Sequence, residues 1–99
     1  MSRDERIANV LSALGDDFRL QVAHAVYTAN KPMTITELRD VLGGPTDIQF
    51  TQKLHYSLNV LHEKGVLVRD VVGPGHAHRY EINPEYAADV LAFLVNVLT

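Results

Sequence analysis

One stretch of the chain, residues 51–64, combines an apolar stripe with side chains that could bind nucleic-acid bases. Leu54, Leu58 and Leu61 recur at helical spacing, which predicts a helix that buries its leucines. The helical period then places on the opposite, exposed side Gln52, Lys53, Tyr56, Asn59 and Glu63. The alternative is that this polar side is merely solvated.

Most of these exposed side chains have a suitable partner on DNA. Glutamine and asparagine can form paired hydrogen bonds with adenine, lysine can bind guanine or phosphate, and tyrosine can donate to phosphate or pack on a thymine methyl. Glu63, at the far end, would repel phosphate unless it lies outside the groove. The predicted DNA contacts on this helix are Thr51, Gln52, Lys53, His55, Tyr56 and Asn59.

A β-hairpin predicted at about residues 66–82 offers a second contact surface. Residues 66–71 are rich in β-branched side chains, Gly73-Pro74-Gly75 is a strong breaker, and residues 78–82 alternate as a half-buried strand does. A tip without bulky side chains can approach the DNA backbone or minor groove closely. The candidate contacts are Arg69, His76, His78 and Arg79. Arg79 is the preferred phosphate contact, with an ion pair to Glu81 or Asp70 as the alternative.

The histidines, five in all, do not predict a metal site or an enzyme. His76 and His78 could share one face of a strand, but two ligands without a third make a weak site. Ser57 and His55 point in different directions on a helix, and no buried acidic partner is evident. Gly73-Pro74-Gly75 lacks the lysine and the following helix of a phosphate loop. We therefore expect no metal, no cofactor and no catalytic residues.

The elements that position these residues follow from apolar spacing and breakers. Ile7, Val10, Leu11 and Leu14 predict a helix over about 3–14, ended by Gly15. A second helix, capped by Asp16 or Asp17, runs to near residues 30–32. The pattern from Thr34 to Glu37 fits a capping box that opens a short third helix, and residues 43–48 form a turn before the helix over 51–64. Pro84 suits the first position of a last helix.

Four segments in this order resemble the ArsR-type winged-helix regulators and their archaeal relatives. They are residues 13–20 (ALGDDFRL), 33–38 (MTITEL), 54–68 (LHYSLNVLHEKGVLV) and 80–85 (YEINPE). The resemblance implies a winged helix-turn-helix that binds double-stranded DNA and regulates transcription, with the helix-turn-helix at about 34–64. The chain departs from the family pattern in a longer turn, residues 44–49, and in Ser57, where the family usually has histidine. The longer turn leaves the register of base contacts uncertain by about one helical turn.

The two terminal helices, 3–14 and 84–98, are predicted to form a two-fold dimer interface. The last helix has more apolar surface than one small core can use. The predicted interface residues are Ile7, Val10, Leu11, Val90, Phe93, Leu94, Val97 and Leu98. A dimer would space two recognition helices roughly 34 Å apart, one turn of duplex, which favours an imperfect palindrome. The alternative is that the last helix simply covers the hairpin and the second helix.

Composition limits the classes of protein that the chain can belong to. With 99 residues, 46% hydrophobic and 21% charged, it suits one folded domain. The absence of cysteine excludes disulfides and thiolate sites. A charged N-terminus and the absence of a long apolar run predict a cytoplasmic protein without a membrane partner. The net charge of −3 argues mildly against nucleic-acid binding, although the charge of the docking face matters more.

The sequence thus predicts one mainly helical (α+β) domain over 1–99, a winged helix-turn-helix with a two-stranded wing over 66–82 and a C-terminal helix. The predicted function is that of a sequence-specific regulator of transcription, a dimeric repressor whose partners are double-stranded DNA and a second copy of the chain. The alternative is a winged-helix module that binds proteins and not DNA. A small-molecule effector at the dimer interface is a further possibility that no residue pattern identifies.

Overall fold

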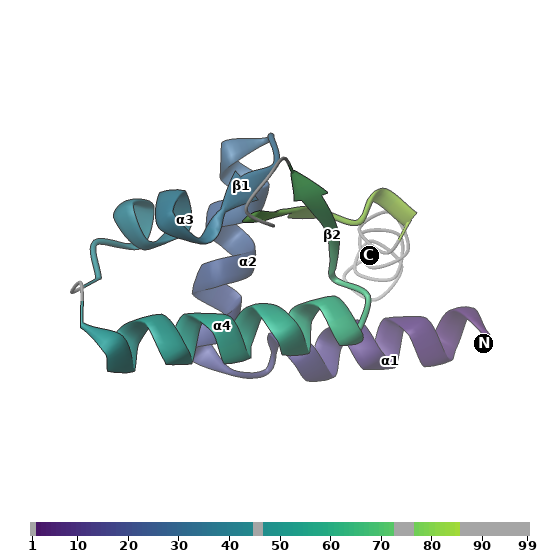
Figure 1. The fold of residues 1–99 in the computed structure, drawn as a ribbon. Helices are drawn as coiled ribbons and strands as arrows, with labels where there is room; N and C mark the ends of the chain where they lie inside the picture. The colour runs from purple at the N-terminus through teal and green to yellow at the C-terminus, as the bar shows by residue number, and fades with distance from the viewer. Residues whose placement is uncertain (1, 45–46, 73–76, 86–99) are drawn as a thin grey trace.

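The computed structural model describes residues 2–44, 47–72 and 77–85 (Figure 1). In chain order the elements are α1 (Arg3–Leu14), α2 (Asp17–Ala29), β1 (Met33–Thr34), α3 (Ile35–Leu42), α4 (Ile48–Glu63), β2 (Leu67–Val72) and β3 (Ala77–Ile82). Helix α2 packs against α1, α3, α4 and β3 and so occupies the centre of the domain. Among the described residues, no helix combines the length and the apolar character needed to cross a membrane.

The helices begin and end where the sequence places strong local signals. The side chain of Ser2 accepts from the Glu5 N–H, and that of Asp16 accepts from the Arg19 N–H. Asn30 ends α2 and Gly43 ends α3, both in the left-handed conformation. The predicted bounds of the first helix and the capping box at Thr34 are therefore confirmed, and of the two candidate caps of the second helix, Asp16 and Asp17, the structure shows Asp16.

Helix α4 begins at Ile48, three residues before the predicted start at Thr51, and this corrects the sequence prediction. The reason is a cap at Asp47, whose carboxylate accepts from the Phe50 N–H at 2.8 Å. The Thr51 hydroxyl also donates to the Asp47 carbonyl at 3.1 Å. The predicted turn over 43–48 is thereby shortened, because its last residue is already helical.

The predicted hairpin is present, but it belongs to a three-stranded sheet, so the prediction of two strands was incomplete. The strand order is β1-β3-β2, antiparallel throughout. Met33 of β1 lies opposite Tyr80, and Leu67 of β2 lies opposite Ile82. A two-residue strand is too short to show any alternation, which is why β1 could not be predicted from the sequence. The short strand ties the start of α3 to the base of the hairpin.

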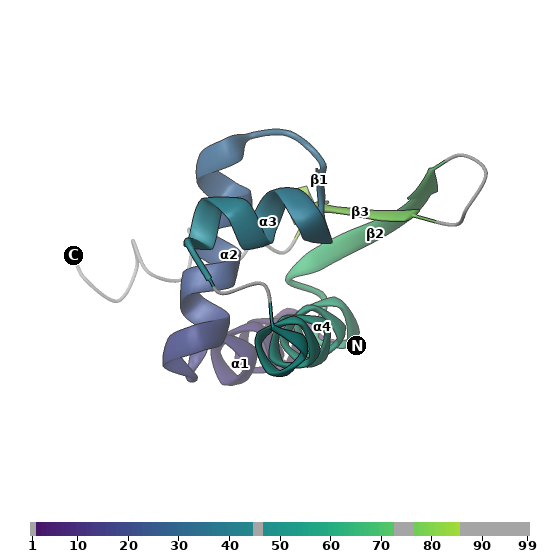
Figure 2. The same ribbon diagram turned by 60° about the vertical axis from the view of Figure 1, so that its left-hand side comes forward.

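The core forms where α4 and α2 meet beneath the sheet. Leu54, Leu58 and Leu61 of α4 are all fully buried, as their spacing predicts. They share the core with side chains from every other element described, among them Val10, Val22, Val26, Leu38, Leu67 and Tyr80. Figure 2 looks nearly along α4, with α2 on one side of it and the hairpin of β2 and β3 projecting away from the body on the other.

The last predicted helix falls almost wholly outside the described residues. Pro84 and Glu85 have helical backbone, and the Asn83 side chain accepts from the Glu85 N–H at 3.2 Å. The start near Pro84 therefore agrees with the sequence. The helix proposed to continue to residue 98 stays a prediction, as does the assignment of all of 1–99 to one domain.

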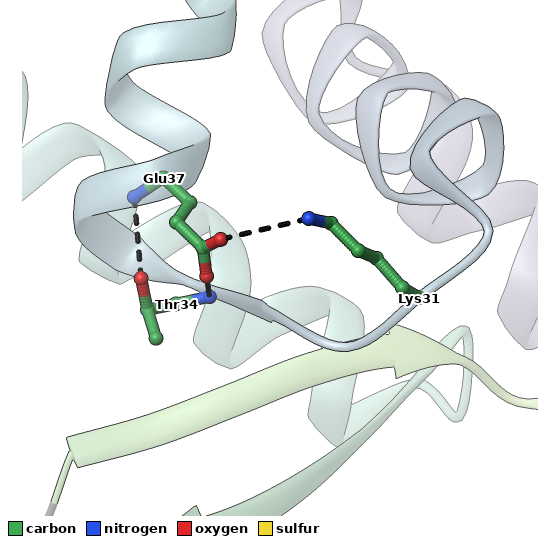
Figure 3. A network of polar contacts seen from close by, with 3 residues as sticks. All are labelled: Lys31, Thr34 and Glu37. Atoms are coloured by element: carbon green, nitrogen blue, oxygen red, sulfur yellow. Dashed lines mark hydrogen bonds and ion pairs between the residues drawn. The ribbon is translucent and has the colours of Figure 1, made fainter.

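A complete capping box fixes the first turn of α3 (Figure 3). The Thr34 hydroxyl accepts from the Glu37 N–H at 3.2 Å, and the Glu37 carboxylate accepts from the Thr34 N–H at 3.0 Å. Lys31 lies 3.9 Å from the same carboxylate. The backbone and side chain of Thr34, then Lys31 and Arg79, lower the pKa of Glu37 below its usual value of 4.5, while partial desolvation opposes them.

The lowered pKa of Glu37 makes part of the stability pH-dependent. A depressed pKa means that the folded state favours the ionised carboxylate, so the contribution is complete above pH 4.5 and is lost as the pH falls through the folded pKa. Glu37→Gln keeps an acceptor for the Thr34 N–H but cannot titrate. We expect the stability of the native protein, measured by urea unfolding, to fall relative to that of Glu37→Gln below pH 4.5. Parallel pH curves for the two proteins would contradict this assignment.

The turn between α3 and α4 is anchored by the ring of Phe50. This half-buried ring lies against Gly44, where an added Cβ would overlap it, and meets the ring of Phe18 edge to face at 5.8 Å. Any side chain at position 44 would therefore require the Phe50 ring to shift. Gly43 needs to be glycine for another reason, since its φ of +67° is left-handed while its surroundings are open.

These two glycines give a matched test of the anchor. Gly44→Ala should destabilise the fold by about 1–3 kcal/mol through overpacking, and most of that cost should vanish in a Phe50→Ala background. Gly43→Ala should cost about 1 kcal/mol in both backgrounds, because its strain lies in the backbone. Denaturant unfolding of the single and double variants measures the coupling. Equal costs of Gly44→Ala with and without the Phe50 ring would show that the ring does not anchor the turn.

Candidate nucleic-acid interface

The side of α4 that faces away from the core is continuous, exposed and mostly polar. Its predicted members Gln52, Lys53, His55, Tyr56 and Asn59 are all exposed, and Tyr56 is 66% exposed. Thr51 is half-buried, and its hydroxyl is used at the start of the helix. Glu63 is also exposed, one turn beyond Asn59. The orientation inferred from the leucine spacing is thus confirmed.

Lys53 does not extend freely into solvent, because its amine lies over an aromatic ring. The Nζ atom is 4.3 Å from the centroid of Phe18. Phe18 comes from the first turn of α2 and also contacts Phe50. A cation held on a ring face at an exposed site gains about 0.5–1 kcal/mol, which is little enough for a phosphate to compete. This contact could not be predicted from the sequence, since 35 residues separate Lys53 from Phe18.

A hydrogen bond joins the exposed side of α4 to the hairpin. The Arg69 guanidinium, on β2, donates to the Asn59 side-chain oxygen at 3.1 Å. Both residues were predicted as DNA contacts on separate elements, and the structure brings them together. The bond uses one lone pair of the Asn59 oxygen and leaves the other lone pair and the side-chain NH2 available for another partner.

Arg79, the preferred phosphate contact of the hairpin, lies beside a carboxylate. Its Nη2 atom is 3.6 Å from Asp70 across the strand pair, so the alternative foreseen in the sequence is what the structure shows. The side chains of Arg79 and Asp70 are 40% and 69% exposed, and an exposed pair of this kind contributes only about 0–1 kcal/mol. The buried Nε of Arg79 has no hydrogen-bond partner among the described residues. The guanidinium is therefore weakly held.

The structure describes one of the two histidines of the hairpin, and it links a histidine of α4 to the sheet. His78 is exposed on β3, and His76 lies outside the described residues. His62 has its Nδ1 atom 3.3 Å from the carbonyl of Leu67, which links the end of α4 to β2. Over 2–44, 47–72 and 77–85, no three histidine or acidic side chains gather as metal ligands would.

Two exposed residues on the first turn of α4 escaped the sequence prediction. Ile48 is 71% exposed and Gln49 is also exposed. The signal that could have found them is Asp47 followed three residues later by Phe50, the first member of the apolar stripe that continues at Leu54 and Leu58. The exposed side of α4 is therefore longer at its N-terminal end than the sequence indicated.

The predicted dimer interface is described only on α1. Ile7 and Val10 are buried within the single chain, whereas Leu11 is 40% exposed. Arg6 of α1 forms an ion pair with Glu85 at 3.6 Å, so the start of the C-terminal segment lies against α1. The other predicted members, Val90, Phe93, Leu94, Val97 and Leu98, lie outside the described residues.

A shallow hollow of about 570 Å³ lies between α2 and α3. Apolar side chains of Ala25, Ala29, Val41 and Leu42 line it, together with the polar Gln21, His24 and Thr28. Nothing in its lining selects a ligand class. The predicted effector therefore stays a prediction.

Comparison with known proteins supports the fold through structure alone, since no family model and no curated protein matches the chain. An ArsR-like transcriptional regulator from Rhodococcus sp. RHA1 aligns with a TM-score of 0.67 and 20% identity over 93% of this chain and 78% of its own. Reduced HlyU from Vibrio cholerae N16961 aligns with a TM-score of 0.64 and 17% identity over 88% of this chain and 83% of its own.

A third solved structure is a homodimeric winged helix-turn-helix DNA-binding domain from Mycobacterium bovis, described as a possible ArsR-family transcriptional regulator. It aligns with a TM-score of 0.66 and 19% identity over 94% of this chain and 78% of its own. At such low identity the likeness concerns the fold, which agrees with the ArsR-type resemblance of the sequence. The chain has the winged helix-turn-helix fold, and we call the hairpin of β2 and β3 its wing.

Proposed function

We propose that the chain is a sequence-specific regulator of transcription that binds double-stranded DNA as a homodimer and represses by occupying its operator. The observation that carries the proposal is the exposed polar side of α4, which lies in the position of a recognition helix and is joined to the wing through Asn59 and Arg69. The similar structures described as an ArsR-like and as a possible ArsR-family transcriptional regulator support a role in binding DNA.

The geometry is suited to a helix in the major groove with the wing on the flanking backbone. Gln52 and Asn59 can read adenine edges, and Tyr56 can reach a phosphate or a thymine methyl. Arg69 and Arg79 extend the contact onto the wing. The proposed dimer would place two α4 helices about one duplex turn apart, roughly 34 Å, on a pseudo-palindromic site. Leu11 of α1 and the apolar residues beyond Glu85 are the proposed interface.

The acidic net charge is compatible with this function because the cations are local. Lys53 lies on α4, and Arg69 and Arg79 lie on the wing. Each has a weak internal partner: the Phe18 ring, the Asn59 amide oxygen and the Asp70 carboxylate. A phosphate can displace such partners at small cost, since exposed contacts of this kind contribute about 1 kcal/mol or less.

The first test is binding of the purified protein to sheared genomic duplex by mobility shift, followed by sequencing of the retained fragments. We expect an enriched, roughly palindromic site. If the three cations of each protomer each bind one phosphate, the logarithm of the affinity should fall with the logarithm of salt with a slope of about −5. Failure to retain any duplex at low salt would overturn the proposal and favour a winged-helix module that binds other proteins.

A pair of tyrosines of almost equal exposure tests whether α4 is the reading element. Tyr56 on α4 is 66% exposed and Tyr27 on α2 is 68% exposed. Tyr56→Ala should weaken binding to the selected site by about 1–3 kcal/mol, and Asn59→Ala should do likewise, whereas Tyr27→Ala should leave affinity unchanged. Neither tyrosine is buried, so thermal unfolding should be nearly unaltered in both variants. Equal losses for Tyr56→Ala and Tyr27→Ala would remove α4 from the interface.

A further inference from the structure

Ile48 is the most exposed of the large apolar side chains described, and it stands at the start of the proposed recognition helix. It is 71% exposed on the first turn of α4. Single exposed apolar residues are common and need no explanation by themselves. What distinguishes Ile48 is its place, because the residues at the N-terminal end of a recognition helix are those that contact base edges.

We propose that Ile48 reads the C5-methyl group of a thymine in the major groove. This inference rests on the proposed DNA-binding function and names one specificity-determining contact within it. Among the groups that the four bases expose in the major groove, the C5-methyl of thymine is the apolar one. An aliphatic side chain is its natural partner. Burying a methyl against Ile48 removes apolar surface of both partners from water.

The neighbours of Ile48 on α4 suit a site rich in A·T pairs. Gln52 follows four residues later, so it shares a helix side with Ile48, and it is exposed. A glutamine can form two hydrogen bonds to one adenine. Asn59 lies farther along the same exposed side and is bound to the wing through Arg69. Ile48 and Gln52 together would select a thymine and an adenine in adjacent or nearly adjacent base pairs.

The first turn of α4 holds Ile48 in a defined position before any ligand binds. The Asp47 cap accepts from the Phe50 N–H, and the Thr51 hydroxyl donates to the Asp47 carbonyl. The Phe50 ring, lying against Gly44 and Phe18, fixes the same turn to the body of the domain. A β-branched isoleucine in a helix is also confined largely to one χ1 rotamer. Little side-chain entropy is therefore lost when the methyl contact forms.

The test removes the methyl from the DNA and the side chain from the protein. In the selected duplex, each thymine of one half-site is replaced in turn by deoxyuridine, which differs from thymidine by that methyl alone. The native protein should lose about fourfold in affinity at one position, the value expected for one methyl group. Ile48→Ala changes both protomers of the proposed dimer, so it should bind the thymine duplex at least as weakly as the native protein binds that uracil duplex, and it should no longer distinguish the two.

Leu20→Ala is the matched control, because Leu20 is an aliphatic residue, 50% exposed, on α2. It should retain the full thymine preference of the native protein. Ile48→Ala should unfold at the native temperature or slightly above, since Ile48 is exposed and alanine favours helix. This rules out misfolding as the cause of weaker binding.

The outcomes separate this inference from the proposed function. Loss of the thymine preference in Ile48→Ala, with its retention in Leu20→Ala, establishes the contact. If the native protein and Ile48→Ala show the same preference at every thymine, or if no thymine matters, the inference is overturned while DNA binding stands. If the native protein binds no duplex, the proposed function fails and this contact fails with it.

Discussion

The burial of three leucines on one side of α4 is the constraint on which the rest of the interface depends. Leu54, Leu58 and Leu61 are fully buried, and each such side chain contributes about 2 kcal/mol or more to folding. No rotation of α4 about its axis could keep them buried and expose a different set of residues. The core therefore dictates which side chains face solvent, and the candidate contacts from Gln52 to Asn59 follow from packing before any ligand is considered.

A second constraint is electrostatic, because the chain has a negative net charge and the proposed ligand, DNA, is also negative. The cations of α4 and the wing all have internal partners, but these partners are exposed and weak: a ring, an amide oxygen and a carboxylate. Such contacts orient Lys53, Arg69 and Arg79 but are weak enough to be replaced by another partner. In the proposed complex the few cations would contribute to affinity, while base contacts would supply the sequence discrimination.

Sequence alone predicts the elements that are set by local chemistry and by periodic burial. The first helix, the Asp16 cap, the Thr34–Glu37 capping box and the outward side of α4 could all be predicted, because each depends on residues within a few positions of one another. Strand β1 could not, since it exists through pairing of Met33 with Tyr80, 47 residues away. The contact of Lys53 with Phe18 and the choice of Asp70 by Arg79 likewise depend on tertiary placement.

The sequence predicts the start of α4 three residues too late, and this error bears on the proposed function. Gly43, Gly44 and Pro45 favoured a long turn, but the Asp47 cap and the Phe50 ring draw the chain into helix by Ile48. Three additional residues lengthen α4 by about 4.5 Å, which is close to one helical turn. A displacement of that size spans more than one base pair along the duplex. In the proposed function, the residues that cap and anchor this turn would therefore determine which bases the helix reaches, although their own side chains need not contact DNA.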